Sequence, residues 1–233
     1  MKTVTTRTFA LTGAAAAMTA MAVLATLPAA ASTDAAKTWT FKAGTAKAGK
    51  TVKFTGTAKG TSAHPAIHFT DKSSNQTLPC TSGSSSGTAK VGKGKRGADI
   101  ATVSGKTLSF SKCTGPGGIP LTVKGSGNWA LNASSYSKAK GGVVTGSLTK
   151  VVSHVSDSSD PSVCEFTASG SVPTYFDNKG DKLVMPGKVA DLKISKVTGC
   201  LGLVNNGDKA TFKATFITKS PTKADNPIKI TSP

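Results

Sequence analysis

The sequence predicts an all-β protein made of two tandem homologous antiparallel units, each of β-sandwich or barrel type and each with one disulfide. Three observations predict this fold: apolar and polar residues alternate with a period of two, the chain carries four cysteines, and its two halves share a pattern. Alternation with a period of two places every second side chain on one face of a strand, whereas an amphipathic helix needs a period near 3.6.

The first 31 residues have the features of a signal peptide. Two cations precede an apolar, uncharged run that ends at Ala29 and Ala31, in the small-residue pattern of a signal-peptidase site. The run is too short and too rich in alanine for a comfortable membrane span, although an uncleaved anchor is the alternative. We expect cleavage before Ser32 or Thr33 and an extracellular, secreted chain that is at most loosely associated with the cell wall.

Alternation is clearest in three segments. Residues 209–216, KATFKATF, place Ala and Phe on one face and Lys and Thr on the other, and 106–112 and 191–197 follow the same rule. A lysine face opposite an apolar face is typical of a half-buried antiparallel strand. The Asn-Gly pair at 206–207 is a strong turn signal because both residues tolerate positive φ, and Pro-Gly-Gly at 116–118 is a looser one.

The chain repeats itself with a shift near 90 residues. Trp39 corresponds to Trp129, and the Thr-Gly-Thr of the first half corresponds to a Thr-Gly-Ser in the second. A period of this length suits one small β unit and is too long for a solenoid. We therefore expect one β unit over 38–126, a second over 127–220, and a C-terminal tail or edge strand over 221–233.

Four cysteines in an exported chain are best interpreted as two disulfides. The sequence alone allows three pairings, and the repeat favours one bond in each unit, Cys80–Cys113 and Cys164–Cys200. In the chain-entropy model, loops of this length stabilise the fold by about 3–4 kcal/mol each. The alternative is a metal held by four thiolates, but the chain has no C-x-x-C pair.

Several segments together resemble a known family. LSFSKCTGPGG, NWALNASSY, VTGCLGLVNNGD and the terminal ITSP are similar to small actinobacterial secreted proteins with duplicated Cys/Gly corner motifs, whose function is not established. The similarity covers the mature chain and is most specific in GCLGLVNNGD. It implies secretion and a disulfide-bonded β structure, and it implies no activity and no catalytic residues.

The composition is strongly basic, with 29 Lys and Arg against 11 Asp and Glu, and 27 basic residues remain after the signal peptide is removed. Nearly all are lysine, which suits diffuse attraction to a polyanion more than paired recognition of phosphate. The densest cluster, Lys90, Lys93, Lys95 and Arg96, is the candidate polyanion-binding site. The alternative is a solvated surface that protects strand edges from aggregation.

Candidates for a metal site are few. His64 and His68 have a spacing that places both on one face of a strand, and Asp71 follows them. A metal site would need a third ligand and a supporting shell of hydrogen bonds. We therefore expect no bound metal and no cofactor.

Candidates for catalysis are equally sparse. Glu165 is the only glutamate, and most aspartates lie in turn sequences, where hydrogen bonding to the backbone explains them. His154 precedes Asp157, but there is no G-x-S-x-G nucleophile elbow. We expect no catalytic residues and predict that the protein is not an enzyme.

The sequence thus predicts a secreted non-catalytic β protein that associates with anionic cell-envelope or matrix polymers through lysine-rich faces. One alternative is a secreted proteinase inhibitor that presents CTGPGGIPL, residues 113–121, and another is an inert structural extracellular protein. An extracellular hydrolase would require Glu165 or His154 in a pocket with another carboxylate. No motif for specific nucleic-acid binding is present, and no membrane span is expected in the mature form.

Overall fold

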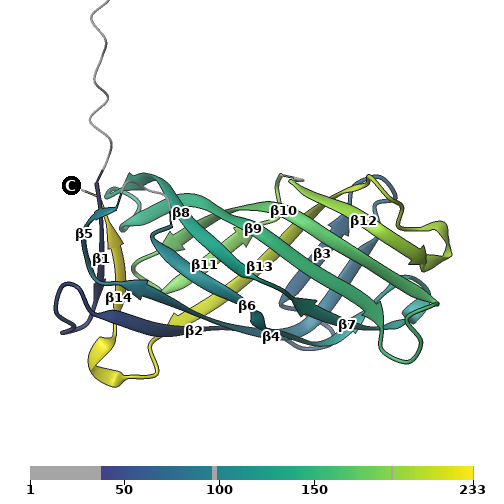
Figure 1. The fold of residues 1–233 in the computed structure, drawn as a ribbon, viewed down its shortest axis with the longest axis horizontal. Helices are drawn as coiled ribbons and strands as arrows, with labels where there is room; N and C mark the ends of the chain where they lie inside the picture. The colour runs from purple at the N-terminus through teal and green to yellow at the C-terminus, as the bar shows by residue number, and fades with distance from the viewer. Residues whose placement is uncertain (1–37, 96–98, 190, 233) are drawn as a thin grey trace, which may run out of the picture. The chain divides into compact units, whose positions relative to one another are not determined.

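A computed structural model describes residues 38–95, 99–189 and 191–232, which form fourteen strands and three short 3-10 helices (Figure 1). The predicted all-β class is confirmed. The signal peptide predicted at 1–31 lies outside the described residues. Among the residues that the structure describes, no helix has the length and apolar character needed to cross a membrane.

Eleven strands pair into one antiparallel sheet. The five long ones are β4 (Thr77–Lys90), β6 (Ala101–Thr114), β9 (Val143–Asp157), β10 (Cys164–Asp177) and β13 (Lys209–Lys219). The six shorter ones are β2 (Thr51–Lys59), β3 (Ile67–Asp71), β7 (Pro120–Gly125), β8 (Asn128–Ser137), β11 (Lys182–Pro186) and β12 (Leu192–Gly199).

The sheet closes on itself as a barrel with eight places around its circumference. Short strands share three of these places in pairs: β2 and β3 lie between β13 and β4, β8 and β7 between β6 and β9, and β11 and β12 between β10 and β13. The long strands fill the other five places. An eight-stranded barrel has an interior just wide enough for side chains or for one small ligand.

Period-two alternation separates the inside of the barrel from the outside. In β2, Val52, Phe54 and Ala58 are buried, and the Thr and Lys residues between them are exposed. In β13 the predicted apolar face is inward and the predicted lysine face is outward. The interior is therefore apolar, and lysine and threonine dominate the outside of these two strands.

A small second sheet covers one end of the barrel (Figure 1). Its strands are β1 (Trp39–Ala43), β5 (Gly92–Lys95) and β14 (Ile228–Thr231), in the order β14-β1-β5. Phe41, Ile228 and Ile230 belong to the same buried core as the barrel residues. The side chain of Asn178, after β10, donates to the Ile230 carbonyl and accepts from the Ile230 N–H at 2.8 Å. β14 is the edge strand expected within 221–233.

Two separate tandem units are not found in the described residues. Strands from 38–126 and from 127–220 lie in one closed sheet around one buried core. Trp39 and Trp129 are both buried, but Trp39 lies in the small sheet and Trp129 in the barrel. The physical reason is that each half alone would leave two unpaired strand edges, and closing one ring pairs all of them.

Both predicted disulfides are confirmed. Cys80–Cys113 joins the adjacent strands β4 and β6, and Cys164–Cys200 joins β10 to the residue after β12, with Cα–Cα distances of 4.0 and 4.2 Å. All four cysteines are buried. Because β4 and β10 lie four places apart in the ring of eight, the two bonds secure opposite walls of the barrel.

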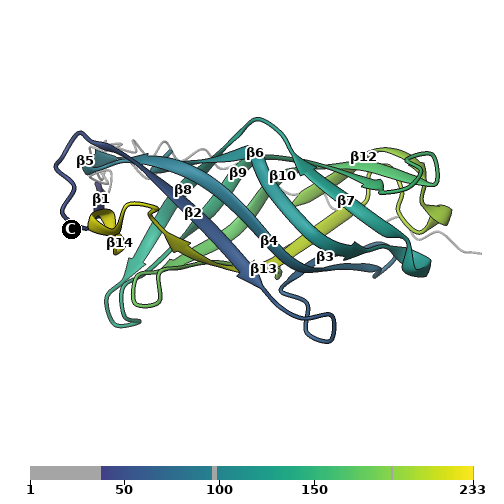
Figure 2. The same ribbon diagram turned by 90° about the horizontal axis from the view of Figure 1, so that it is seen from below.

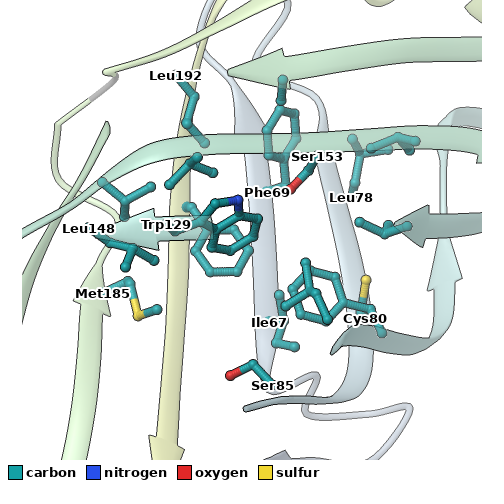
Figure 3. A pocket seen from close by; sticks show the side chains of 18 of the residues that line it. Ile67, Phe69, Leu78, Cys80, Ser85, Trp129, Leu148, Ser153, Met185 and Leu192 are labelled. Atoms are coloured by element: carbon teal, nitrogen blue, oxygen red, sulfur yellow. The ribbon is translucent and has the colours of Figure 1, made fainter. Parts of the chain in front are cut away.

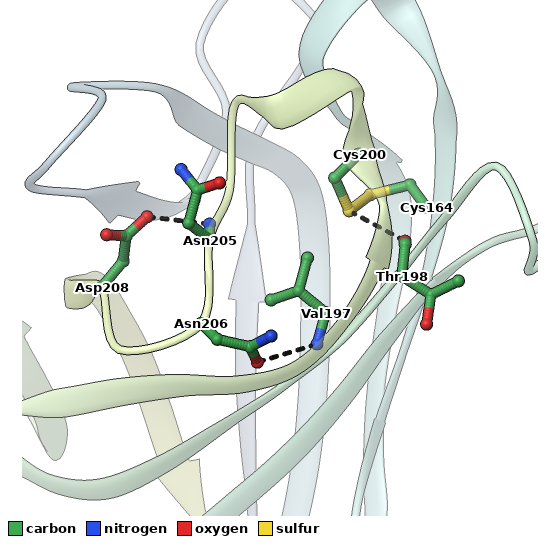
Figure 4. Close-up of a disulfide and its surroundings, with 7 residues drawn as sticks. All are labelled: Cys164, Val197, Thr198, Cys200, Asn205, Asn206 and Asp208. Atoms are coloured by element: carbon green, nitrogen blue, oxygen red, sulfur yellow. Dashed lines mark hydrogen bonds between the residues drawn. A yellow bond between two sulfur atoms is a disulfide. The ribbon is translucent and has the colours of Figure 1, made fainter.

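The corner after β12 depends on one glycine (Figure 4). Gly199 has a φ of 67°, and a Cβ at this position would lie 2.2 Å from the Val163 carbonyl oxygen. This close approach lets the Cys200 N–H donate to the same oxygen at 2.8 Å. The Asn-Gly pair at 206–207 lies in a turn as predicted, but inside a longer connection over 200–208. The corner therefore has a structural role, because it positions Cys200 for its disulfide with Cys164.

The variants Gly199→Ala and Gly202→Ala distinguish two reasons for glycine in this corner. One is the positive φ, and the other is the close approach of a backbone carbonyl. Both positions have positive φ, but a Cβ on Gly202 would meet nothing within 4 Å. We expect Gly202→Ala to cost about 1–2 kcal/mol of unfolding free energy from backbone strain. Gly199→Ala should cost about 1–3 kcal/mol more, because the Val163 carbonyl must also move. Urea unfolding of the oxidised protein measures both, and equal losses would contradict the proposed contact.

Candidate functional site

Four strands that neighbour one another in the barrel, β13, β2, β4 and β6, carry lysines and no acidic residue (Figure 2). We call their outer surface the lysine face. Its eight lysines are all exposed. They are Lys209, Lys213 and Lys219 of β13, Lys53 and Lys59 of β2, Lys90 of β4, and Lys106 and Lys112 of β6.

Hydroxyl side chains lie between these lysines. Two rows cross β2, β4 and β6: Thr57, Ser84 and Ser109 form one, and Lys59, Ser82 and Ser111 form the next. A hollow of about 360 Å³ lies over these rows, since serine, glycine and alanine leave room that larger side chains would fill. Hydroxyl and ammonium groups both donate hydrogen bonds to anionic oxygens.

Within the described residues, no ion pair neutralises the lysine face. The three ion pairs join Lys50 to Asp225, Lys229 to Asp181, and His154 to Glu165, and all lie elsewhere. The acidic residues of the long barrel strands are in β9 and β10. The acidic residues of the long strands are therefore confined to one side of the barrel, whereas lysines occur on both sides.

The structure divides the predicted basic cluster between two sheets. Lys90 is exposed at the end of β4 and belongs to the lysine face. Lys93 and Lys95 lie in β5 of the small sheet, and Arg96 lies outside the described residues. Of the eight lysines, sequence reasoning named only Lys90 as a site residue and missed the other seven, which strand pairing brings together from distant segments. The signal in the sequence is that four lysine-containing segments, 51–59, 77–90, 101–114 and 209–219, lack any acidic residue.

The predicted catalytic candidates lie on the outer surface. His154 Nε2 is 2.7 Å from Glu165 Oε1, and these two side chains are 46% and 34% exposed. Asp157 does not approach His154 and instead accepts hydrogen bonds from the Ser159 and Asp160 N–H groups. Neither His154 nor Glu165 lines the interior cavity or either of the other two main pockets of the described part of the chain.

The predicted metal candidates are not brought together. His64 is exposed before β3, and His68 is oriented outward with Nε2 3.1 Å from the Pro65 carbonyl oxygen. Asp71 is fully buried, because it lies three residues after His68 on a strand and so faces the opposite side. In the described ranges, no three His, Cys, Asp or Glu residues are grouped to hold a metal ion.

Asp71 instead forms a carboxyl pair with Asp208. Asp71 Oδ1 accepts the Ser73 N–H at 2.7 Å, while its buried Oδ2 has no hydrogen-bond partner. Burial raises the pKa of Asp71, and the neighbouring Asp208 raises it further. Burial also acts to raise the pKa of Asp208, but hydrogen bonds from Ser73 and from the Asn205 N–H, together with the neighbouring Asp71, outweigh it and lower this pKa. Asp71 is therefore the member of the pair that gains a proton at the higher pH.

The barrel interior contains a cavity of about 70 Å³ (Figure 3). Its lining is apolar and aromatic, including Phe69, Trp129 and Met185, and no lining side chain is charged. The hydroxyl residues Ser85 and Ser153 also line it. The chain thus has two distinct candidate sites, the lysine face outside and this cavity inside.

No family model matches the chain, and no curated protein or solved structure matches it. The chemistry of these two sites is therefore the basis for assigning a function.

The carboxyl pair predicts a pH dependence of stability. Because the pKa of Asp71 is raised above its ordinary value of 3.8, its contribution is present at low pH and is lost as pH rises through the folded pKa. Asp71→Asn replaces the carboxyl group with an amide that does not ionise, so the variant does not lose this stability as pH rises. We expect the variant to gain stability relative to the wild type as pH rises above about 4, as measured by urea unfolding across a pH series.

Asp160→Asn is the control with the opposite sign. Hydrogen bonds from Ser162 lower the pKa of Asp160, so its contribution is present at neutral pH and is lost as pH falls. The control should be less stable than the wild type at neutral pH and should converge with it in acid. Parallel profiles for Asp71→Asn and the wild type would contradict the raised pKa of Asp71.

Proposed function

We propose that this is a non-catalytic extracellular β protein that associates with anionic cell-envelope or matrix polymers through the lysine face. The observation that carries the proposal is the group of eight exposed lysines on four neighbouring strands without an acidic residue. Two disulfides and no free cysteine are compatible with an oxidising, extracellular location.

A polymer suits this surface better than a small anion. The lysines are spread over four strands, and neighbouring strands are about 4.8 Å apart. No described pocket is lined by several of these lysines. Lys59 is the one lysine that lines the hollow. A chain with repeated charges can contact many lysines at once, and the summed weak contacts give useful affinity.

The hydroxyl rows add hydrogen bonding to this attraction. Thr57, Ser84 and Ser109 provide donors within the hollow beside Lys59. These groups can donate to phosphate, carboxylate or sugar oxygens of a polymer that charge has already attracted. Binding of this kind is strongly weakened by salt, since counterions compete for both partners.

The inhibitor alternative has less support from the geometry. Residues 113–121 form a compact corner, in which the Gly115 N–H donates to the Ile119 carbonyl at 2.7 Å and Pro116 is buried. Thr114 pairs directly with Pro120. This leaves little extended main chain to present to a protease.

Two triple variants with the same net charge test the proposal. Lys53→Glu, Lys59→Glu and Lys213→Glu alter the lysine face, and the matched control reverses three exposed lysines in turns away from it, Lys138, Lys140 and Lys179. Each lysine near an anionic surface contributes about 1 kcal/mol, so the face variant should bind about a hundredfold more weakly at low salt. The control should bind nearly as well as the wild type.

The measurement is co-sedimentation with cell walls, before and after their anionic polymers are removed, across a salt series. Binding should require those polymers and should fall steeply with salt. Equal losses in the two triple variants would assign binding to net charge rather than to the lysine face. Wild-type binding that ignores both salt and polymer removal would overturn the proposal.

A further inference from the structure

We propose that the barrel interior binds one small uncharged molecule with an apolar body and one hydrogen-bonding group, for which a short-chain alcohol is the model ligand. The site is the cavity of about 70 Å³. It is independent of the lysine face, because its lining side chains belong to the inward positions of the strands.

The cavity lies beside only some of the side chains that are oriented into the barrel. At Gly83 and Gly87, large rings fill the interior: an added Cβ would lie 2.5 Å from Phe110 Cδ1 and 2.4 Å from Phe54 Cζ, respectively. Ser85 and Ala168 also line the interior, and the cavity remains beside them. The cavity is therefore a site of small side chains in an otherwise filled barrel, as expected when eight strands leave room for one small ligand.

Two serine residues contribute a small polar area to an otherwise apolar cavity. Ser85 and Ser153 are among its lining residues, and neither hydroxyl has a hydrogen-bond partner in the part of the chain that the structure describes (Figure 3). A hydroxyl in an apolar interior is unfavourable without a partner. Ser85 is in β4 and Ser153 in β9, three places apart around the ring, so the two hydroxyls come from different walls.

This arrangement favours an amphiphilic guest over water alone. A buried water needs two to four polar partners, and hydroxyls on separate walls within an apolar lining do not supply them. A guest with a hydroxyl group can bond to one serine while its apolar part contacts residues such as Phe69 and Leu148. An ionised ligand is excluded, because no lining side chain is charged and an unpaired buried charge is very unfavourable.

The volume limits the size of the guest. An engineered protein cavity of about 150 Å³ binds benzene. The cavity of about 70 Å³ is roughly half as large, so its guest is smaller than benzene. Straight-chain alcohols of increasing length therefore provide a direct measurement of the available space.

Trp129 reports on the cavity directly. It lines the cavity, whereas Trp39, the only other tryptophan, lies in the small sheet. In a Trp39→Phe background, 1-alkanols from methanol to octanol are titrated and followed by Trp129 fluorescence and by thermal unfolding. We expect affinity to rise about fourfold per methylene and to stop rising before six carbons. A continuous rise to octanol, or no response, would overturn the proposal.

Filling the cavity tests the location of binding. Ala168→Leu adds bulk at an inward position of β10, and Ser169→Leu makes a similar change at the next, outward position. We expect Ala168→Leu to abolish the response and Ser169→Leu to preserve it. Alkanol binding that survives in a folded Ala168→Leu variant would place the ligand elsewhere and overturn the proposal.

Ser153→Val is the second variant, because Ala168→Leu can fail to fold. It replaces the hydroxyl with one methyl group and adds a second methyl group. We expect alkanol affinity to fall about tenfold, in line with the loss of a hydrogen bond to a group left buried, while binding of xenon, which needs no hydrogen bond, is retained. Unchanged alkanol affinity in both Ser153→Val and Ser85→Val would remove the hydroxyl groups from the proposal and overturn it.

Discussion

Closure of the sheet is the constraint on which the rest of the structure depends. Once every strand has two neighbours, no strand edge is left in the ring, and each residue is assigned to the inside or the outside by its parity along the strand. The apolar core, the cavity and the lysine face all follow from this assignment. A shift of one residue in β2 or β13 would place lysines in the core, so the sequence pattern fixes the register of these strands.

The two cysteine corners secure this closure at one end. Each disulfide joins neighbouring strands, and the two lie on opposite walls of the ring. The corners also meet: a Cβ on Gly117 would lie 3.9 Å from Leu201 Cδ1. The small sheet covers the other end, where Asn178 bonds to Ile230. The corners therefore serve packing and chain reversal, and none of the groups examined for catalysis lies in them.

The sequence was informative about local pattern and uninformative about pairing partners. Period two identified the strand at Lys209–Lys219, and the repeat identified both disulfides, because these signals lie within single segments or in cysteine spacing. Closure depends on which distant strands become neighbours, so two units were expected in place of one ring. For the same reason the sequence predicted lysine-rich faces but not which lysines share one surface, and the pair of Asp71 with Asp208 could not be found from residues so far apart.

Electrostatic repulsion between lysines on the outside of the barrel is relevant to the function of that surface. Lys193 of β12 lies directly opposite Lys209 of β13, and like charges in this arrangement are destabilising. A surface that served only to keep the protein dispersed would mix both signs, since interspersed charges give the same hydration with less repulsion. A polyanion bound to the lysine face would relieve that repulsion, so the fold and the complex would stabilise each other through the same lysines. Under the proposed function, the absence of acidic residues from this face is explained by a polyanionic partner that relieves the repulsion between its lysines.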